Sequence, residues 1–256
     1  MAGNNTGAPG ASVTSRVLAL LGAFDSRSRS LTLSELARRA DLPLTTAHRL
    51  VGELVAWGAL TRQPSGEYVV GRRLWDLGLL APDRNGLRQV AAPFLHDLYA
   101  TTLATTALAV RDGTQALNID RLSGRASVAI PSDVGSRVPL HATGVGKVLL
   151  AYAPPDVQAD VLSNLKRLTP YTVTQPGLLR QQLSRVRRDG FAQSNEEMSM
   201  GACSVAVPIR RADGTVVAAL GVVVPDLRRN RPRMIAALSV AAQGIARSID
   251  QHSVMV

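Results

Sequence analysis

The 256-residue sequence has one cysteine, Cys203, and four scattered histidines. A single cysteine cannot form an internal disulfide, and no histidines cluster at zinc-ligand spacing, so neither a metal nor another cofactor is expected. No apolar run reaches the ~20 residues that span a bilayer. The first residues lack the basic and apolar segments of a secretory signal, and we expect residues 1–11 to be a disordered tail. These absences favour a cytoplasmic protein with no membrane partner.

Motifs for catalysis are also scarce. The stretch from His141 to Lys147 resembles a phosphate-binding loop, but that loop needs Gly in place of His141 and Ser or Thr in place of Val148. No G-x-S-x-G nucleophile motif occurs. The adjacent pair Glu196-Glu197 could supply acid/base chemistry, although neighbouring carboxylates on a loop are more often solvated or salt-bridged. The sequence therefore predicts a protein that is not an enzyme.

Positive charge is in excess: the sequence has 29 Lys and Arg against 19 Asp and Glu, and a formal net charge of +10. A basic protein suits a polyanionic partner. The excess is +3 in residues 12–80 (nine Arg, six acids) and +7 in residues 81–256 (20 basic residues, 13 acids), so charge alone does not locate a nucleic-acid site. Two arginine clusters are expected to be solvated faces: Arg180, Arg185, Arg187 and Arg188, and Arg228, Arg229, Arg231 and Arg233.

Residues 31–70 have the pattern of a winged helix-turn-helix. Thr32 and Glu35 have capping-box spacing, which predicts a helix from about Leu33. Pro43 interrupts it, and a second helix is predicted over 44–57, ended by Gly58. A buried stripe is expected at Ala47, Leu50, Leu54 and Trp57, and a preceding helix at Val13, Val17, Leu20, Leu21 and Phe24. This layout sets one helix into the major groove of DNA.

The exposed side of the second helix supplies the candidate DNA contacts, which are Thr45, Thr46, His48 and Arg49. Strands are predicted at 60–63 and 67–70, joined by Pro64-Ser65-Gly66, with Arg62 near the tip of the wing. Gly52 is costly inside a helix and suggests a close approach to a phosphate backbone or another helix. A three-helix structural module without a DNA role is the alternative.

The remainder of the chain predicts a second domain. Residues 12–80 are expected to form the DNA-binding domain, 81–90 a linker with the start of a helix, and 91–256 an α+β domain. Hairpins are predicted around Asp112-Gly113 and residues 212–214, where turn residues separate strand-like runs. Helices are expected near 143–152, 156–162, 178–188 and 232–249. Paired strands with helices on them indicate an antiparallel sheet.

Several motifs in order resemble the IclR family of bacterial transcriptional regulators over about residues 12–250. The residues that carry the resemblance are Thr45–Leu50, Tyr68–Leu74, Pro139–Ala151, Asp189–Ala192 with Glu196-Glu197, and Gly201–Ile209. The resemblance implies an N-terminal winged helix-turn-helix and a C-terminal GAF-like antiparallel-sheet domain that binds small organic acids or aromatic metabolites. It also implies a homodimer or a homotetramer (a dimer of dimers) that binds a pseudo-palindromic double-stranded operator as repressor or activator.

The resemblance also implies where the effector binds. The implied effector contacts are Gly144, Val145, Ser194, Cys203, Ser204, Gly221 and Val223. A helix is expected to begin at Gly144 and Val145, and the backbone N–H groups at such a helix N-terminus can bind a carboxylate. The apolar residues from Gly221 to Val223 favour a larger, partly hydrophobic effector such as an aromatic acid over pyruvate. In the alternative interpretation, the glycines only permit a tight loop and the valines only form core.

Two hypotheses for function remain. The first is a ligand-responsive regulator that binds its operator through residues 44–57. The second is a small-molecule enzyme with an N-terminal targeting or dimerisation module. The absence of a nucleophile–base pair favours the first.

Overall fold

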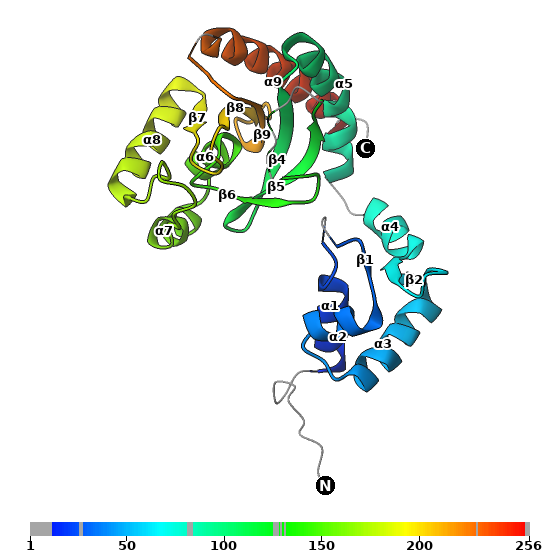
Figure 1. Cartoon of the computed structure of the whole chain (residues 1–256). Coiled ribbons are helices and arrows are strands. Elements are labelled where there is room, and N and C mark those ends of the chain that lie inside the picture. Colours follow the sequence, from blue (N-terminus) through cyan, green and yellow to red (C-terminus); the bar gives the residue numbers. More distant parts are fainter. Residues whose placement is uncertain are drawn as a thin grey trace. The chain divides into compact units, whose positions relative to one another are not determined.

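The computed structural model describes residues 12–25, 28–80, 84–124, 128, 130, 132–228 and 230–253 (Figure 1). The predicted tail at 1–11 and the predicted linker residues 81–83 lie outside this range. The chain divides into two compact units, Met1–Pro82 and Asp83–Val256. Each unit has its own buried apolar core and is described by itself.

The first unit contains four helices and a small sheet in its described residues. In chain order these are α1 (Val13–Gly22), β1 (Ser30–Leu31), α2 (Leu33–Arg39), α3 (Leu44–Trp57), β2 (Leu60–Arg62), β3 (Tyr68–Val70) and α4 (Arg72–Leu79). The antiparallel sheet has the order β1-β3-β2. Leu20, Leu36, Leu50 and Leu60 are fully buried and join α1, α2, α3 and the wing into one core.

Local chemistry sets the ends of α2 and α3. The capping box is present: Thr32 Oγ1 accepts from the Glu35 N–H, and Glu35 Oε2 accepts from the Thr32 N–H at 2.8 Å. After α2, Asp41 adopts a positive φ of 53° in the turn. Gly58 ends α3 in the left-handed conformation at φ 84°, where an L side chain would be strained. The predicted bounds of both helices are confirmed.

Several local expectations in this unit were wrong. Trp57 was expected in the buried stripe of α3, but it is 44% exposed. Its ring lies 4.5 Å from the guanidinium of Arg73 of α4 and is not enclosed by core residues. The two wing strands are each shorter than predicted, and α1 ends before Phe24. Two elements, β1 and α4, were not predicted. β1 has only two residues, and α4 follows the wing after a single residue, Gly71, so neither has a clear sequence pattern of its own.

The second unit is an α+β fold around a six-stranded antiparallel sheet. Its elements are α5 (Arg84–Thr102), β4 (Thr105–Asp112), β5 (Gln115–Leu122), β6 (Arg137–Pro139), α6 (Gly144–Ala151), α7 (Pro155–Ser163), α8 (Pro176–Asp189), β7 (Ala192–Asn195), β8 (Cys203–Arg210), β9 (Val216–Val224) and α9 (Arg231–Ser253). The strand order is β6-β5-β4-β9-β8-β7. Both predicted hairpins, β4–β5 and β8–β9, are confirmed. The edge strands β6 and β7 were not predicted.

Helices cover both faces of this sheet. On one face α5 and α9 pack together over a core that includes Leu108, Val205 and Leu220 (Figure 1). On the other face α6 and α8 enclose a second core that includes Val148, Leu150 and Ala206. Side chains alternate between the two faces along each strand, so neighbouring residues reach different cores. Among the described residues no helix is long and apolar enough to cross a membrane.

Candidate functional site

One side of α3 carries polar side chains that no core residue covers. Thr45, His48 and Arg49 are exposed and Thr46 is half-buried, while Ala47 and Leu50 of the same turns are buried. Arg49 Nη1 lies 2.5 Å from Glu53 Oε1, and both side chains are mostly exposed. An exposed ion pair of this kind contributes little to stability, so the guanidinium is free to exchange Glu53 for another anion or acceptor.

The wing and Gly52 complete this surface. Arg62 is exposed at the end of β2, and its guanidinium lies 5.9 Å from the ring centre of Tyr68. A Cβ added at Gly52 would meet no atom within 4 Å, so packing inside the described unit does not require a glycine there. A close approach at Gly52 would have to come from another molecule.

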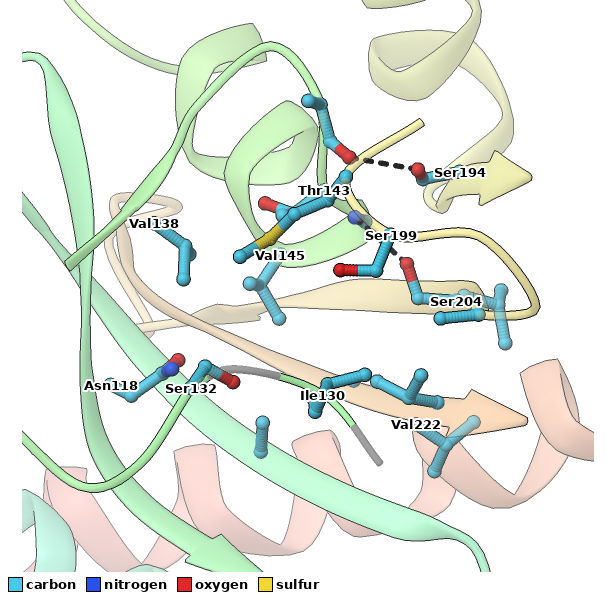
Figure 2. Close-up of a pocket in the computed structure, with 18 residues that line it drawn as sticks. Asn118, Ile130, Ser132, Val138, Thr143, Val145, Ser194, Ser199, Ser204 and Val222 are labelled. Carbon is cyan, nitrogen blue, oxygen red and sulfur yellow. Dashed lines mark hydrogen bonds between the residues drawn. The ribbon is translucent and has the colours of Figure 1, made fainter. Parts of the chain in front are cut away.

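The second unit contains a cavity between α6 and the sheet, which we call the apolar cavity. Its empty space is about 560 Å³, counting the opening. Its walls come from the start of α6, from the strands β4 to β9, and from the segments before β6 and after β7 (Figure 2). The side chains and backbone that line it include Ala107, Val138, Val145, Met198, Ala202, Val205, Gly221, Val222 and Val223. A lining of this type favours a ligand with a large apolar body.

Backbone donors lie at one end of the apolar cavity, where α6 begins. Thr143 is the N-cap, and its Oγ1 accepts from the Gly146 N–H at 3.0 Å. The Gly144 N–H donates to Ser204 Oγ at 3.1 Å. Among the described residues the Val145 N–H has no hydrogen-bond partner. The first turn of α6 therefore offers one free donor, and the helix dipole adds a positive potential.

Hydroxyl and amide groups flank both ends of the apolar cavity. Ser199 and Ser204 lie near the start of α6, whereas Asn118 and Ser132 lie together at the other end (Figure 2). Asn118 is buried and its Nδ2 donates to Ser136 Oγ at 3.4 Å. Ser194 Oγ donates to the Ala142 carbonyl at 2.9 Å, which ties β7 to the loop before α6.

The structure brings six of the seven expected effector residues to this cavity: Gly144, Val145, Ser194, Ser204, Gly221 and Val223. Cys203 does not line it. Its side chain packs in the core under α5 and α9, on the opposite face of the sheet from Ser204, because adjacent strand residues alternate. Burial raises the pKa of the Cys203 thiol. Cys203 is therefore not retained as a candidate contact.

Some of the glycines have a packing role, as the alternative interpretation of a tight loop expected. A Cβ at Gly146 would lie 2.6 Å from the Pro139 carbonyl oxygen, so Gly146 permits a tight loop. A Cβ at Gly221 would lie 2.9 Å from Val145 Cγ1, so Gly221 lets α6 approach the sheet and also lines the cavity. Sequence reasoning missed Asn118, Ser132 and Ser199, because nothing in their local sequence marks them as neighbours.

The adjacent carboxylates of Glu196 and Glu197 have different partners. Glu197 Oε1 lies 2.5 Å from the Nζ of the buried Lys147, and Nζ also donates to the Gln193 carbonyl. Glu196 Oε2 accepts from the Gly201 N–H at 2.8 Å. Burial lowers the pKa of Lys147, and Glu197 opposes that shift. In the described part of the chain no group of His, Cys, Asp and Glu side chains could hold a metal ion.

Comparison with known proteins agrees with this arrangement. The family model described as "IclR helix-turn-helix domain" matches residues 13–64, and that described as "Bacterial transcriptional regulator IclR C-terminal" matches residues 80–251. The chain belongs to the IclR family. It is thus a transcriptional regulator with a helix-turn-helix DNA-binding domain and a C-terminal effector domain.

Individual relatives are regulators too. The chain is 33% identical to the transcriptional regulator BhcR of Paracoccus denitrificans, covering 87% of this chain and 80% of that protein. It is 30% identical to the repressor AllR of Salmonella typhi, covering 90% and 86%. A crystal structure of an IclR homologue from Microbacterium hydrocarbonoxydans, complexed with 4-hydroxybenzoate, is 38% identical with a TM-score of 0.88 over 93% of this chain and 98% of that one.

Proposed function

We propose that this regulator senses an aromatic carboxylic acid in the apolar cavity. The observation that carries the proposal is the single unpartnered N–H of Val145, set at a helix N-terminus against a wall of small apolar residues. A carboxylate would accept from this N–H and from the Ser204 hydroxyl, whose oxygen already accepts from Gly144. An aromatic ring would lie between Val145 and Val223 of β9.

The polar groups at the other end suit a ring substituent. Asn118 and Ser132 lie across the cavity from the start of α6, so a hydroxyl para to the carboxylate would meet them (Figure 2). The relative that is complexed with 4-hydroxybenzoate supports this class of ligand. A three-carbon acid such as pyruvate would leave most of the apolar wall uncovered.

The same proposal assigns the DNA contacts. Thr45, Thr46, His48 and Arg49 of α3 would contact base edges and phosphates in the major groove, and Arg62 would contact the backbone from the wing. The regulator would bind a pseudo-palindromic operator as a homodimer or a dimer of dimers. We further propose that the second unit has no catalytic activity, because the ionisable side chains of Lys147 and Glu197 are buried and salt-bridged to each other.

Calorimetric titration of the full-length protein tests the effector class. We expect 4-hydroxybenzoate to bind, and 4-hydroxybenzamide, which has the same shape but no charge, to bind at least about tenfold more weakly, or about 1.4 kcal/mol. At a concentration 100 times its Kd, the acid should stabilise the fold by about 2.7 kcal/mol. Binding of pyruvate in preference to every aromatic acid would overturn the proposal.

A further inference from the structure

The two arginine clusters that the sequence suggested were solvated faces meet at one place in the fold. Arg185 and Arg188 of α8 and Arg231 of α9 line a second depression, beside β7 and α6, which we call the polar hollow. Its empty space is about 1170 Å³, counting the part open to solvent. Arg231 is 43 and 46 positions from Arg188 and Arg185 in the chain, yet the three guanidinium groups lie around one space.

The charges that line the polar hollow do not balance. Arg188 pairs with Asp189 at 2.7 Å and Lys147 pairs with Glu197 at 2.5 Å, which uses both carboxylates of the lining. Within the described chain, neither Arg185 nor Arg231 forms a salt bridge with a carboxylate. Asp189, whose pKa is lowered mainly by its hydrogen bond with Arg188, also interacts with the charge of Arg185. Two positive charges are therefore left over, and an anion in the hollow would be attracted to them.

Amide side chains make up much of the remaining lining. Gln182, Gln193 and Asn195 contribute groups that both donate and accept hydrogen bonds. Gln193 Oε1 accepts from Arg231 at 3.2 Å, which holds that guanidinium over the hollow. Gln182 Oε1 is buried, and the described residues give it no partner. Such groups complement hydroxyls, so the lining fits a hydroxylated anion better than a bare one.

The polar hollow and the apolar cavity share a wall. The backbone of α6, of β7 and of the segment after β7 runs between the apolar cavity and the polar hollow. Residues close together on these elements therefore line one or the other. Val145, Ser194 and Met198 line the apolar cavity, whereas Lys147, Gln193 and Glu197 line the polar hollow. A ligand that shifts β7 or α6 from one side therefore moves groups that line the other side.

We propose that the polar hollow is a second ligand site, for a small hydroxylated anion such as a phosphorylated or carboxylated sugar, and that its occupancy changes the affinity of the apolar cavity. Arg185 and Arg231 hold the anionic group, and the amides of Gln182, Gln193 and Asn195 take the hydroxyls. The binding is independent of the aromatic-acid proposal; only the coupling rests on it. Coupling of this kind is reciprocal between the two ligands.

Calorimetric titration of the full-length regulator tests the site, with glucose 6-phosphate, gluconate and inorganic phosphate as probes. We expect a hydroxylated probe to bind at least about tenfold more tightly than inorganic phosphate. The variant Arg185→Gln/Arg231→Gln should lose about tenfold or more in affinity for that probe. The matched control Arg180→Gln/Arg233→Gln removes two exposed arginines from the same two helices, outside the lining, and should bind as the wild type does.

Failure of all three probes to bind the wild type, or equal losses in the lining and control variants, would overturn the site. Displacement of the probe by a random DNA duplex would also overturn it and identify the hollow as a phosphate-backbone contact. Titration of 4-hydroxybenzoate with and without a saturating probe then tests the coupling. We expect a change of about fivefold or more in its Kd, absent in Arg185→Gln/Arg231→Gln. An unchanged Kd in the wild type would overturn the coupling and leave the site standing.

Discussion

Two ion pairs, one in each unit, have the same 2.5 Å separation and opposite surroundings. Arg49 and Glu53 lie on the surface of α3 with 59% and 61% of their side chains exposed. Lys147 and Glu197 lie in the wall between the apolar cavity and the polar hollow, with 1% and 8% exposed. The first pair is hydrated, so each side chain can replace its partner with water or another group. The second pair is buried, so its two charges interact with each other and not with water.

The difference shows how each unit keeps its binding surface available. On α3, the core residues lie on one side and the candidate DNA contacts lie on the other, so a residue of the exposed side can change without disturbing the fold. In the second unit the ligand-facing wall is also part of the packing, because α6 and β7 serve both. We expect substitutions there to alter stability and binding together.

Removing one member of the buried pair has the largest expected effect. Glu197→Ala leaves the Lys147 ammonium uncompensated in the interior and should lower the free energy of unfolding by about 3–5 kcal/mol. Chemical denaturation measures this. The double variant Lys147→Met/Glu197→Leu removes both charges and should recover most of the loss. A double variant as unstable as Glu197→Ala would contradict this account of the pair.

The next effect concerns the start of α6. A Cβ at Gly144 would lie 3.0 Å from Ser204 Oγ, so Gly144→Val should displace that serine and fill the space next to the Val145 N–H. We expect the affinity for 4-hydroxybenzoate to fall by at least about tenfold, while operator binding without ligand is retained. The control is Gly177→Val in the first turn of α8, where a Cβ would meet nothing within 4 Å. Unchanged affinity in Gly144→Val would place the effector elsewhere.

On the exposed side of the comparison, Arg49→Ala should weaken binding to a duplex selected in vitro by the wild type. A guanidinium that reads a base edge contributes about 1–3 kcal/mol and gives sequence preference. Unfolding should change little, because the pair with Glu53 is solvated. Glu53→Gln is the control: it breaks the ion pair but keeps Arg49, so operator affinity should be preserved. Equal affinity of wild type and Arg49→Ala for the selected and a random duplex would remove Arg49 from the interface.

The same contrast explains what the sequence could predict. Thr32, Glu35, Pro43 and Gly58 act on residues within one helical turn, so the start of α2 and both ends of α3 could be predicted from the local sequence. The apolar cavity depends on strand parity and on long-range pairing. Resemblance to a family predicted both Ser204 and Cys203 as effector contacts, but only Ser204 lines the cavity, because its neighbour Cys203 faces the other way.

Other features of the second unit had no local signal. Asn118 reaches the cavity from β5, and its neighbour there, Ser132, comes from the segment before β6. Lys147 and Glu197 are 50 positions apart, and their pairing follows from how α6 packs against the segment after β7. The arginines of α8 and α9 had the pattern of solvated faces, and only the tertiary fold brings them together.

The smallest expected effect comes from the capping box of α2, which is exposed like the pair on α3. Thr32→Ala should cost about 1 kcal/mol, because the first turn loses a side-chain acceptor. Hydrogen bonds from the Thr32 backbone and hydroxyl lower the pKa of Glu35 below the ordinary value of a glutamate. A lowered pKa in the folded state means that the cap is fully stabilising above the unfolded value and is lost as pH falls through the folded one. The melting temperature of the wild type should therefore fall more steeply on acidification than that of Glu35→Gln, and parallel curves would show that the Glu35 carboxylate adds nothing to the cap.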